Sequence, residues 1–186
     1  KVEKLMVKDA LRAIQFAKVC ILMLDARQAP HKQDITIARH IADEGRALII
    51  AANMWDAVED KSSSIKQIND RLKISLAQLR GVPIVPISGL YGKGVDRLFD
   101  SVQIIKSIWQ KRISTGKLNR WLEMMLEAHP PPLVQGRRLR IRYMTQVKTR
   151  PPTFTLFISR PEDLPESYVR YLISGLRDEF NLNGVP

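Results

Sequence analysis

Apolar residues occur along this chain in short unbroken runs that alternate with longer stretches of helical spacing. Runs of apolar residues with almost no polar interruption predict strands buried on both faces of a parallel sheet, and they lie at 19–24, 47–52 and 82–87. Apolar residues that recur every three or four positions predict amphipathic helices, and these lie at 2–17, 34–44, 65–79 and 95–105. Strands and helices that alternate with short connections predict an α/β domain with a parallel sheet.

The predicted sheet is small for this fold class. A parallel sheet covered by helices on both faces normally has more than three strands, and Lys1 falls inside the first predicted helix. We therefore expect the chain to be the later part of a longer polypeptide.

The pattern changes after residue 112. A helical stretch ends at His129-Pro130-Pro131-Pro132, an alternating strand covers 138–147, a second strand covers 154–158, and a helix follows the acidic residues near 162–166. The order helix, strand, strand, helix predicts a small α+β module. In the alternating strand we expect one side to be buried (Leu139, Ile141, Tyr143, Thr145 and Val147) and the other to be exposed (Arg138, Arg140, Arg142, Met144 and Gln146).

Positive charge is concentrated in this second region. The chain has a formal net charge of +11 and a sequence pI near 10.0, and residues 111–150 hold ten Lys or Arg against two acidic residues. Such a cluster favours an anionic partner, and RNA is the candidate, through Arg138, Arg140, Arg142, Lys148 and Arg150. The alternative is a solvated edge strand whose charges prevent edge-to-edge association.

Other features limit the classes of function. A single cysteine, Cys20, allows no internal disulfide, and no apolar run approaches the roughly 20 residues that span a bilayer. We expect a cytoplasmic protein without a membrane partner. The three histidines have no metal-ligand spacing, so we assign neither a metal site nor a catalytic residue.

Polar residues follow two of the predicted strands directly. Asn53 and Asp56 come after the run at 47–52, and Ser88-Gly89-Leu90 comes after the run at 82–87. Because ligands bind beyond the carboxyl ends of strands in open α/β sheets, we expect both segments to line one pocket.

Asn53-Met54-Trp55-Asp56 resembles the base-recognition motif Asn-Lys-x-Asp of GTP-binding proteins, and Ser88-Gly89-Leu90 resembles their Ser-Ala-x loop. A carboxylate at the Asp position accepts hydrogen bonds from N1–H and the 2-amino group of guanine, and a main-chain N–H at the Ala position donates to the guanine oxygen. Gly89 retains that N–H. Met54 stands where the family has lysine, and it covers a base by packing alone. An isolated Asn-x-x-Asp also serves as a plain loop cap, but two such loops one β-α-β unit apart favour guanine.

The loop that cradles phosphates, Gly-x-x-x-x-Gly-Lys-Ser/Thr, does not occur in these 186 residues. The glycine-rich segment 89–94 has a different spacing and no hydroxyl residue after Lys93, which is typical of a turn into a helix. The chain thus carries the part of a GTPase site that recognises the guanine base, without the part that binds phosphates and metal.

Taken together, the chain resembles the C-terminal part of the Der (EngA) family, bacterial tandem GTPases that act in assembly of the large ribosomal subunit. The resemblance covers essentially the whole chain, and it rests on Val2-Glu3-Lys4, Leu24-Asp25-Ala26, Gln33-Asp34, Asn53-Met54-Trp55-Asp56, residues 87–95, His129-Pro130-Pro131-Pro132 with Gly136-Arg137-Arg138, and residues 163–172. It implies a partial P-loop-GTPase-type sheet with flanking helices over residues 1–113 and a KH-like domain over 114–186. The Gly-x-x-Gly loop of ordinary KH modules does not occur within residues 114–186.

The resemblance also implies ligands and partners. It implies GTP or GDP as ligand, with Mg²⁺ only where a phosphate loop is present, and the large ribosomal subunit or its RNA as partner. Two hypotheses stay open. In the first, the chain is part of a ribosome-assembly GTPase with guanine-recognition loops and a basic KH-like domain. In the second, it is a nucleotide-free RNA-binding module on a degenerate G-domain scaffold.

Overall fold

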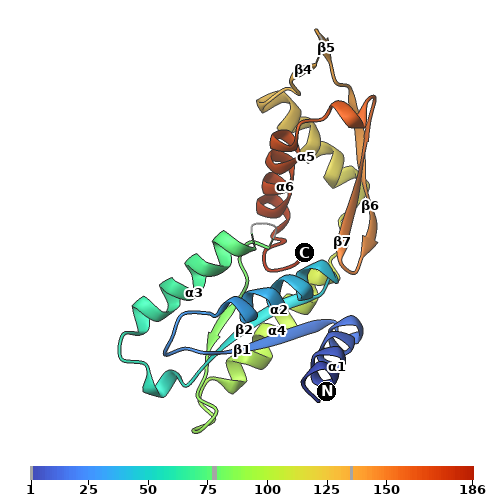
Figure 1. Ribbon diagram of the computed structural model, residues 1–186. Helices are drawn as coiled ribbons and strands as arrows, with labels where there is room; N and C mark the ends of the chain where they lie inside the picture. Colours follow the sequence, from blue (N-terminus) through green and yellow to red (C-terminus); the bar gives the residue numbers. More distant parts are fainter. Residues whose placement is uncertain (1, 77–78, 135) are drawn as a thin grey trace. The chain divides into compact units, whose positions relative to one another are not determined.

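The computed structural model describes residues 2–76, 79–134 and 136–186, and it describes their side chains except at 2–8, 134, 137 and 138. The chain divides into two compact units, shown in Figure 1. Unit 1 comprises Lys1–Trp109 together with Asn183–Pro186, and unit 2 comprises Gln110–Leu182. Among the described residues, no helix combines the length and the apolar character needed to cross a bilayer.

Unit 1 is the predicted α/β domain. In chain order its elements are α1 (Val2–Phe16), β1 (Val19–Asp25), α2 (Lys32–Asp43), β2 (Ala47–Asn53), the 3-10 helix η1 (Trp55–Ala57), α3 (Lys61–Ser75), β3 (Ile84–Pro86) and α4 (Val95–Trp109). The three strands form one parallel sheet in the order β1-β2-β3, with Asp25 paired to Asn53 and Ala52 paired to Pro86. The prediction of a parallel sheet with flanking helices is confirmed.

Strand β2 lies at the centre of this sheet and organises the core. Leu48, Ile50 and Ala52 pack in one cluster with buried residues of α2 and α3, while Ile49 and Ala51 point to the other face, which α4 covers. All residues of β2 from Ala47 to Ala52 have essentially no exposed surface. This burial on both faces explains why the run contains no polar residue.

Strand β1 differs from the prediction. We expected it to be buried on both faces, but the side chains of Ile21 and Met23 are 43% and 57% exposed. The strand is one of the two outer members of the described sheet, and one of its faces is partly open.

Residues 183–186 belong to unit 1 although they follow the whole of unit 2. The N–H of Gly184 donates to the carbonyl of Arg80 at 2.6 Å, and Val185 is 1% exposed. A Cβ on Gly184 would lie 2.7 Å from Ile105 Cδ1, so the segment packs closely against α4.

Unit 2 is the predicted α+β module. Its elements are α5 (Thr115–Ala128), β4 (Leu133–Val134), β5 (Arg137–Arg138), β6 (Ile141–Thr149), β7 (Pro152–Ile158), the 3-10 helix η2 (Pro161–Asp163) and α6 (Glu166–Phe180). Strands β6 and β7 form an antiparallel ribbon that packs against α5, and β4 and β5 form a separate short hairpin that the sequence did not indicate. Trp121 of α5 is 3% exposed and forms an edge-to-face contact with Phe180 of α6.

The predicted faces of β6 are wrong over most of the strand. Leu139 is buried as expected, but Met144 and Gln146 are 5% and 3% exposed, while Tyr143 and Val147 are 43% and 52% exposed. The pairing with β7 shifts register between Ile141 and Tyr143, and again between residues 146 and 148. A bulge of one residue changes which side chains face the core, here from odd-numbered to even-numbered positions. Hydrophobic alternation in the sequence does not reveal such a bulge.

Candidate functional site

The two polar loops predicted in unit 1 lie side by side at the carboxyl ends of β2 and β3. The N–H of Ile87 donates to the carbonyl of Ala52 at 2.9 Å, and the N–H of Trp55 donates to the carbonyl of Ile87 at 3.1 Å. These main-chain bonds continue the β2–β3 pairing past the end of the strands. The loops at 53–56 and 88–90 therefore start from a fixed relative position.

The side chain of Asn53 joins three strand ends. Its Oδ1 accepts a hydrogen bond from the N–H of Gly89 at 2.9 Å, and its Nδ2 lies 3.6 Å from the sulfur of Met23, near the end of β1. A Cβ on residue 89 would lie 3.3 Å from Asn53 Oδ1, which is a tight contact. Glycine at this position avoids that contact. Asn53 thus ties the two loops together.

This arrangement uses the N–H that we expect to meet the guanine oxygen. Gly89 has a single main-chain N–H, and in this structure it donates its hydrogen bond to Asn53 Oδ1. A base that accepts from Gly89 therefore competes with Asn53, and one hydrogen bond has to be exchanged for another.

The residues after Asn53 place a carboxylate in solvent. Met54 adopts a left-handed backbone conformation (φ 61°, ψ 30°), and the single-turn helix η1 follows it. Met54 is 41% exposed, and Asp56 is exposed. Within the part of the chain that the structure describes, the Asp56 carboxylate has no hydrogen-bond or ion-pair partner, so both of its oxygens are available to a ligand.

The loop 88–94 is held by a compact turn. Ser88 is 2% exposed, its N–H donates to the carbonyl of Lys93 at 2.9 Å, and its hydroxyl accepts the N–H of Tyr91 at 3.3 Å. Gly94 closes the turn with φ +83°, and a Cβ there would lie 2.4 Å from the carbonyl oxygen of Pro86. Leu90, at the far side of the turn, is 79% exposed.

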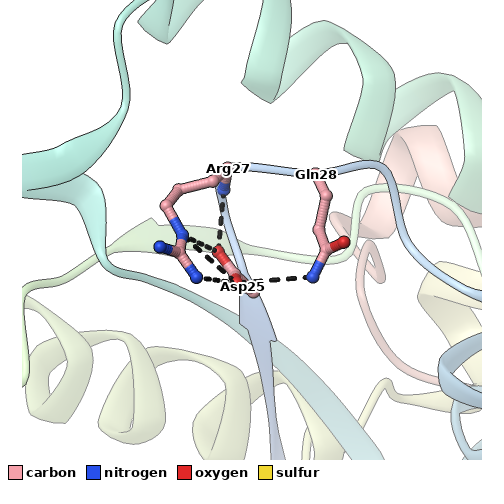
Figure 2. A network of polar contacts seen from close by, with 3 residues as sticks. All are labelled: Asp25, Arg27 and Gln28. Carbon is pink, nitrogen blue, oxygen red and sulfur yellow. Dashed lines mark hydrogen bonds and ion pairs between the residues drawn. The ribbon is translucent and has the colours of Figure 1, made fainter.

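A charged cluster at the end of β1 was not predicted as part of the site. Figure 2 shows Asp25 accepting hydrogen bonds from the side chain and the N–H of Arg27 and from Gln28. The shortest of these, from the Arg27 guanidinium, is 2.7 Å. The side-chain and main-chain donors of Arg27 lower the pKa of Asp25 to about 2. A carboxylate at a strand end with arginine two positions later is the only sequence signal for this cluster.

The basic candidates of unit 2 are accessible but not arranged as a regular face. Arg140, Arg142, Lys148 and Arg150 are exposed, and the side chain of Arg138 lies outside the described residues. Next to Arg142, the ring of Tyr143 stacks on that of Phe157 across the ribbon, with centroids 4.2 Å apart and planes inclined by 12°. Both rings are more than a third exposed, so cationic and aromatic groups lie together on this ribbon.

Comparison with known proteins decides the family. Residues 6–107 match the family model for the elongation factor Tu GTP-binding domain. Residues 112–186 match the model for the KH-domain-like C-terminal region of EngA bacterial GTPases. The chain belongs to the Der (EngA) family.

Curated members of the Der family match over the whole chain. GTPase Der of Bartonella bacilliformis is 49% identical and GTPase Der of Brucella melitensis biotype 2 is 53% identical, each over all 186 residues. The chain spans 39% and 38% of the length of these two relatives.

Solved structures add little to the family assignment. Era from Aquifex aeolicus bound to GDP·AlF4⁻ aligns with 95% of this chain and 65% of its own, with 17% identity and a TM-score of 0.47. A TM-score below 0.5 is too low to support an inference from that likeness.

Proposed function

We propose that this chain binds the base of a guanine nucleotide between the loops 53–56 and 88–90, as part of a cytoplasmic GTPase that acts in assembly of the large ribosomal subunit. Membership of the Der family supports the GTPase assignment. The observation that carries the proposal is the hydrogen bond from Gly89 to Asn53, because it joins both loops beside the exposed carboxylate of Asp56.

Each residue of the two loops has a separate task in this proposal. Asp56 accepts hydrogen bonds from N1–H and the 2-amino group of guanine, and adenine offers no such pair of donors. Gly89 donates to the guanine oxygen after it leaves Asn53, and Met54 covers one face of the base by packing. Ser88 is buried and stabilises the turn through its hydrogen bonds with Tyr91 and Lys93, while Leu90 borders the base.

The residues of this chain fit a base and not the remainder of a nucleotide. They include no phosphate loop, so we assign them no role in holding phosphates or Mg²⁺ and no step of hydrolysis. Within the whole protein, the GTPase reaction requires groups beyond those described here.

A titration with nucleotides tests base recognition. We expect the chain to bind GDP more tightly than ADP when each is titrated in a calorimeter. Asp56→Asn should weaken GDP binding about tenfold or more, because a charge-assisted hydrogen bond contributes roughly 1.5–3 kcal/mol.

Xanthosine diphosphate supplies the complementary probe. Xanthine carries an oxygen in place of the 2-amino group, and an asparagine amide can accept from N1–H while it donates to that oxygen. The Asp56→Asn variant should therefore gain xanthosine diphosphate binding while it loses GDP binding. Equal affinity of the unmodified chain for GDP and ADP would refute base recognition by these loops.

We also propose that unit 2 binds ribosomal RNA through Arg138, Arg140, Arg142, Lys148 and Arg150. The match of residues 112–186 to the KH-domain-like family and the exposure of four of these side chains support this. The stacked pair of Tyr143 and Phe157 offers an aromatic surface next to the cations, and single-stranded RNA uses such surfaces for its bases.

Charge reversal tests the RNA proposal. The double variant Arg140→Glu and Arg142→Glu should weaken binding to a ribosomal RNA fragment and lower the dependence of log K on log salt. The matched control reverses Arg71 and Arg97, two exposed arginines of unit 1. If both double variants lose affinity equally, the ribbon has no specific role and only net charge matters.

A further inference from the structure

Unit 2 contains a cavity that neither of the proposed sites uses. It has a volume of about 660 Å³ and lies where the segment 111–114, the first turns of α5 and the last turn of α6 meet. Four basic side chains line it, and Glu179 is its single acidic residue; the cations are Lys111, Arg112, Lys117 and Arg120.

Within the described residues none of the four cations has an ion-pair partner, and only Lys111 makes a hydrogen bond. The ammonium of Lys111 donates to the carbonyl of Phe180 at 2.7 Å, so it is held against the end of α6. Arg112, Lys117 and Arg120 are exposed, and within the described part of the chain their side chains have no hydrogen-bond or ion-pair partner. The cavity therefore carries an excess of positive charge that water alone solvates.

The backbone that carries Arg112 is fixed from the inside of the unit. Gln146 of β6 is 3% exposed, its Nε2 donates to the carbonyl of Lys111 at 2.8 Å, and its Oε1 accepts the N–H of Ile113 at 2.7 Å. These two bonds hold residues 111–113 in place before any ligand arrives. Residues 111–113 are therefore already ordered, and a ligand binds without the entropic cost of ordering them.

The first turn of α5 opens onto the same cavity. Ser114 is the N-cap, its side chain makes no capping hydrogen bond, and the first turn holds no acidic residue. Ser114 and Lys117 of this turn line the cavity, and a Cβ on Gly116 would meet nothing within 4 Å. A 14-residue helix presents about half a positive charge at that end.

We propose that this cavity binds a phosphate group, held by Arg112, Lys117 and Arg120 together with the main-chain N–H groups at the start of α5. Guanidinium groups bind phosphate oxygens in pairs, and the start of a helix supplies further donors without an opposing charge. The phosphate is either a phosphodiester of an RNA backbone or a free phosphate or monoester. This site is separate from the strand β6 arginines and does not depend on the proposed functions.

Gly116→Glu is the variant that isolates the site. A glutamate there adds a negative charge to the turn that carries the lining residues Ser114 and Lys117, while a non-glycine residue and an acid in the first turn both favour the helix. Ser167→Glu is the matched control, because Ser167 is exposed at the same position of the first turn of α6, and α6 lines the cavity only with Glu179 and Phe180 of its last turn. The double variant Lys117→Gln and Arg120→Gln removes cations without adding an acid.

The first measurement follows the main-chain N–H signals of residues 115–117 by NMR while inorganic phosphate is added to the full chain in low-salt buffer. We expect saturable shifts in the unmodified chain and in Ser167→Glu, and none in Gly116→Glu or the double variant. Thermal unfolding of every variant accompanies this, and Gly116→Glu should unfold no earlier than the unmodified chain.

The second measurement uses a uridine 12-mer RNA, with binding followed by fluorescence anisotropy. A roughly tenfold loss of affinity in Gly116→Glu relative to Ser167→Glu identifies the ligand as a backbone phosphodiester. If only inorganic phosphate distinguishes the two variants, the ligand is a free phosphate or monoester. If neither phosphate nor RNA distinguishes them, the cavity is not a phosphate site and the proposal is wrong.

Discussion

Replacing Gly94 with alanine should destabilise unit 1 more than the same replacement at Gly92. Both glycines have positive φ, +83° and +67°, so alanine at either position costs about 1 kcal/mol for the left-handed backbone. At Gly92 nothing lies within 4 Å of the added Cβ. At Gly94 the Cβ would be 2.4 Å from the carbonyl oxygen of Pro86, about 1 Å closer than a normal carbon–oxygen contact.

That oxygen is part of the main chain at the end of β3, so it cannot move aside as a flexible side chain does. Relief of such overpacking costs about 1–3 kcal/mol, which brings the total for Gly94→Ala to about 2–4 kcal/mol. Urea denaturation followed by circular dichroism measures both variants. With a slope of about 2 kcal/mol/M, the midpoint should fall by about 1–2 M for Gly94→Ala and about 0.5 M for Gly92→Ala. Equal shifts for the two variants would show that the turn relaxes freely and that the contact is unimportant.

Three further predictions concern polar contacts. Because the pKa of Asp25 is lowered from 3.8 to about 2, its contribution to stability is present above pH 3.8 and lost as the pH falls toward 2. Arg27→Ala should therefore lower the urea midpoint slightly at pH 7, where solvent screens the pair, and leave it unchanged near pH 2, as urea titrations at both pH values would show. Gln146→Leu should destabilise unit 2 by about 2–4 kcal/mol, because two main-chain groups lose their partners; a loss below about 1 kcal/mol in urea would contradict this. Asn53→Ala should cost about 1 kcal/mol or less and speed hydrogen exchange at the N–H of Gly89, and unchanged exchange would mean that the two loops are not tied by this side chain.

The elements that were predicted correctly are those for which the sequence pattern is compatible with only one packing arrangement. The run at 47–52 is buried on both faces, so its uniform apolar character specifies a central strand. The proximity of the loops after 47–52 and 82–87 was expected because parallel strands bring their carboxyl ends to one edge, whereas the bond between Asn53 and Gly89 was not predicted. In both cases local pattern and tertiary packing point to the same structure.

The wrong or missing predictions depend on information that the pattern does not contain. An outer strand such as β1 has the same apolar composition as a central one, and only the arrangement of the sheet decides its exposure. In β6 the bulges change which parity is buried, so Tyr143 is exposed and Gln146 is buried. The contact of Asp25 with Arg27 is not specified by the family segment Leu24-Asp25-Ala26, and the basic cavity at α5 combines residues from the two ends of unit 2.

The return of residues 183–186 to unit 1 has a consequence for the order of synthesis. Synthesis proceeds from the amino end toward the carboxyl end, so the main-chain bond from Gly184 to Arg80 forms only after all 73 residues of 110–182 have been made. Unit 1 therefore stays incomplete, without the segment that packs on Ile105 and on the turn at Gly81, until unit 2 has been made. Unit 2 is continuous in the chain and has no such delay, so the later unit is expected to finish folding first.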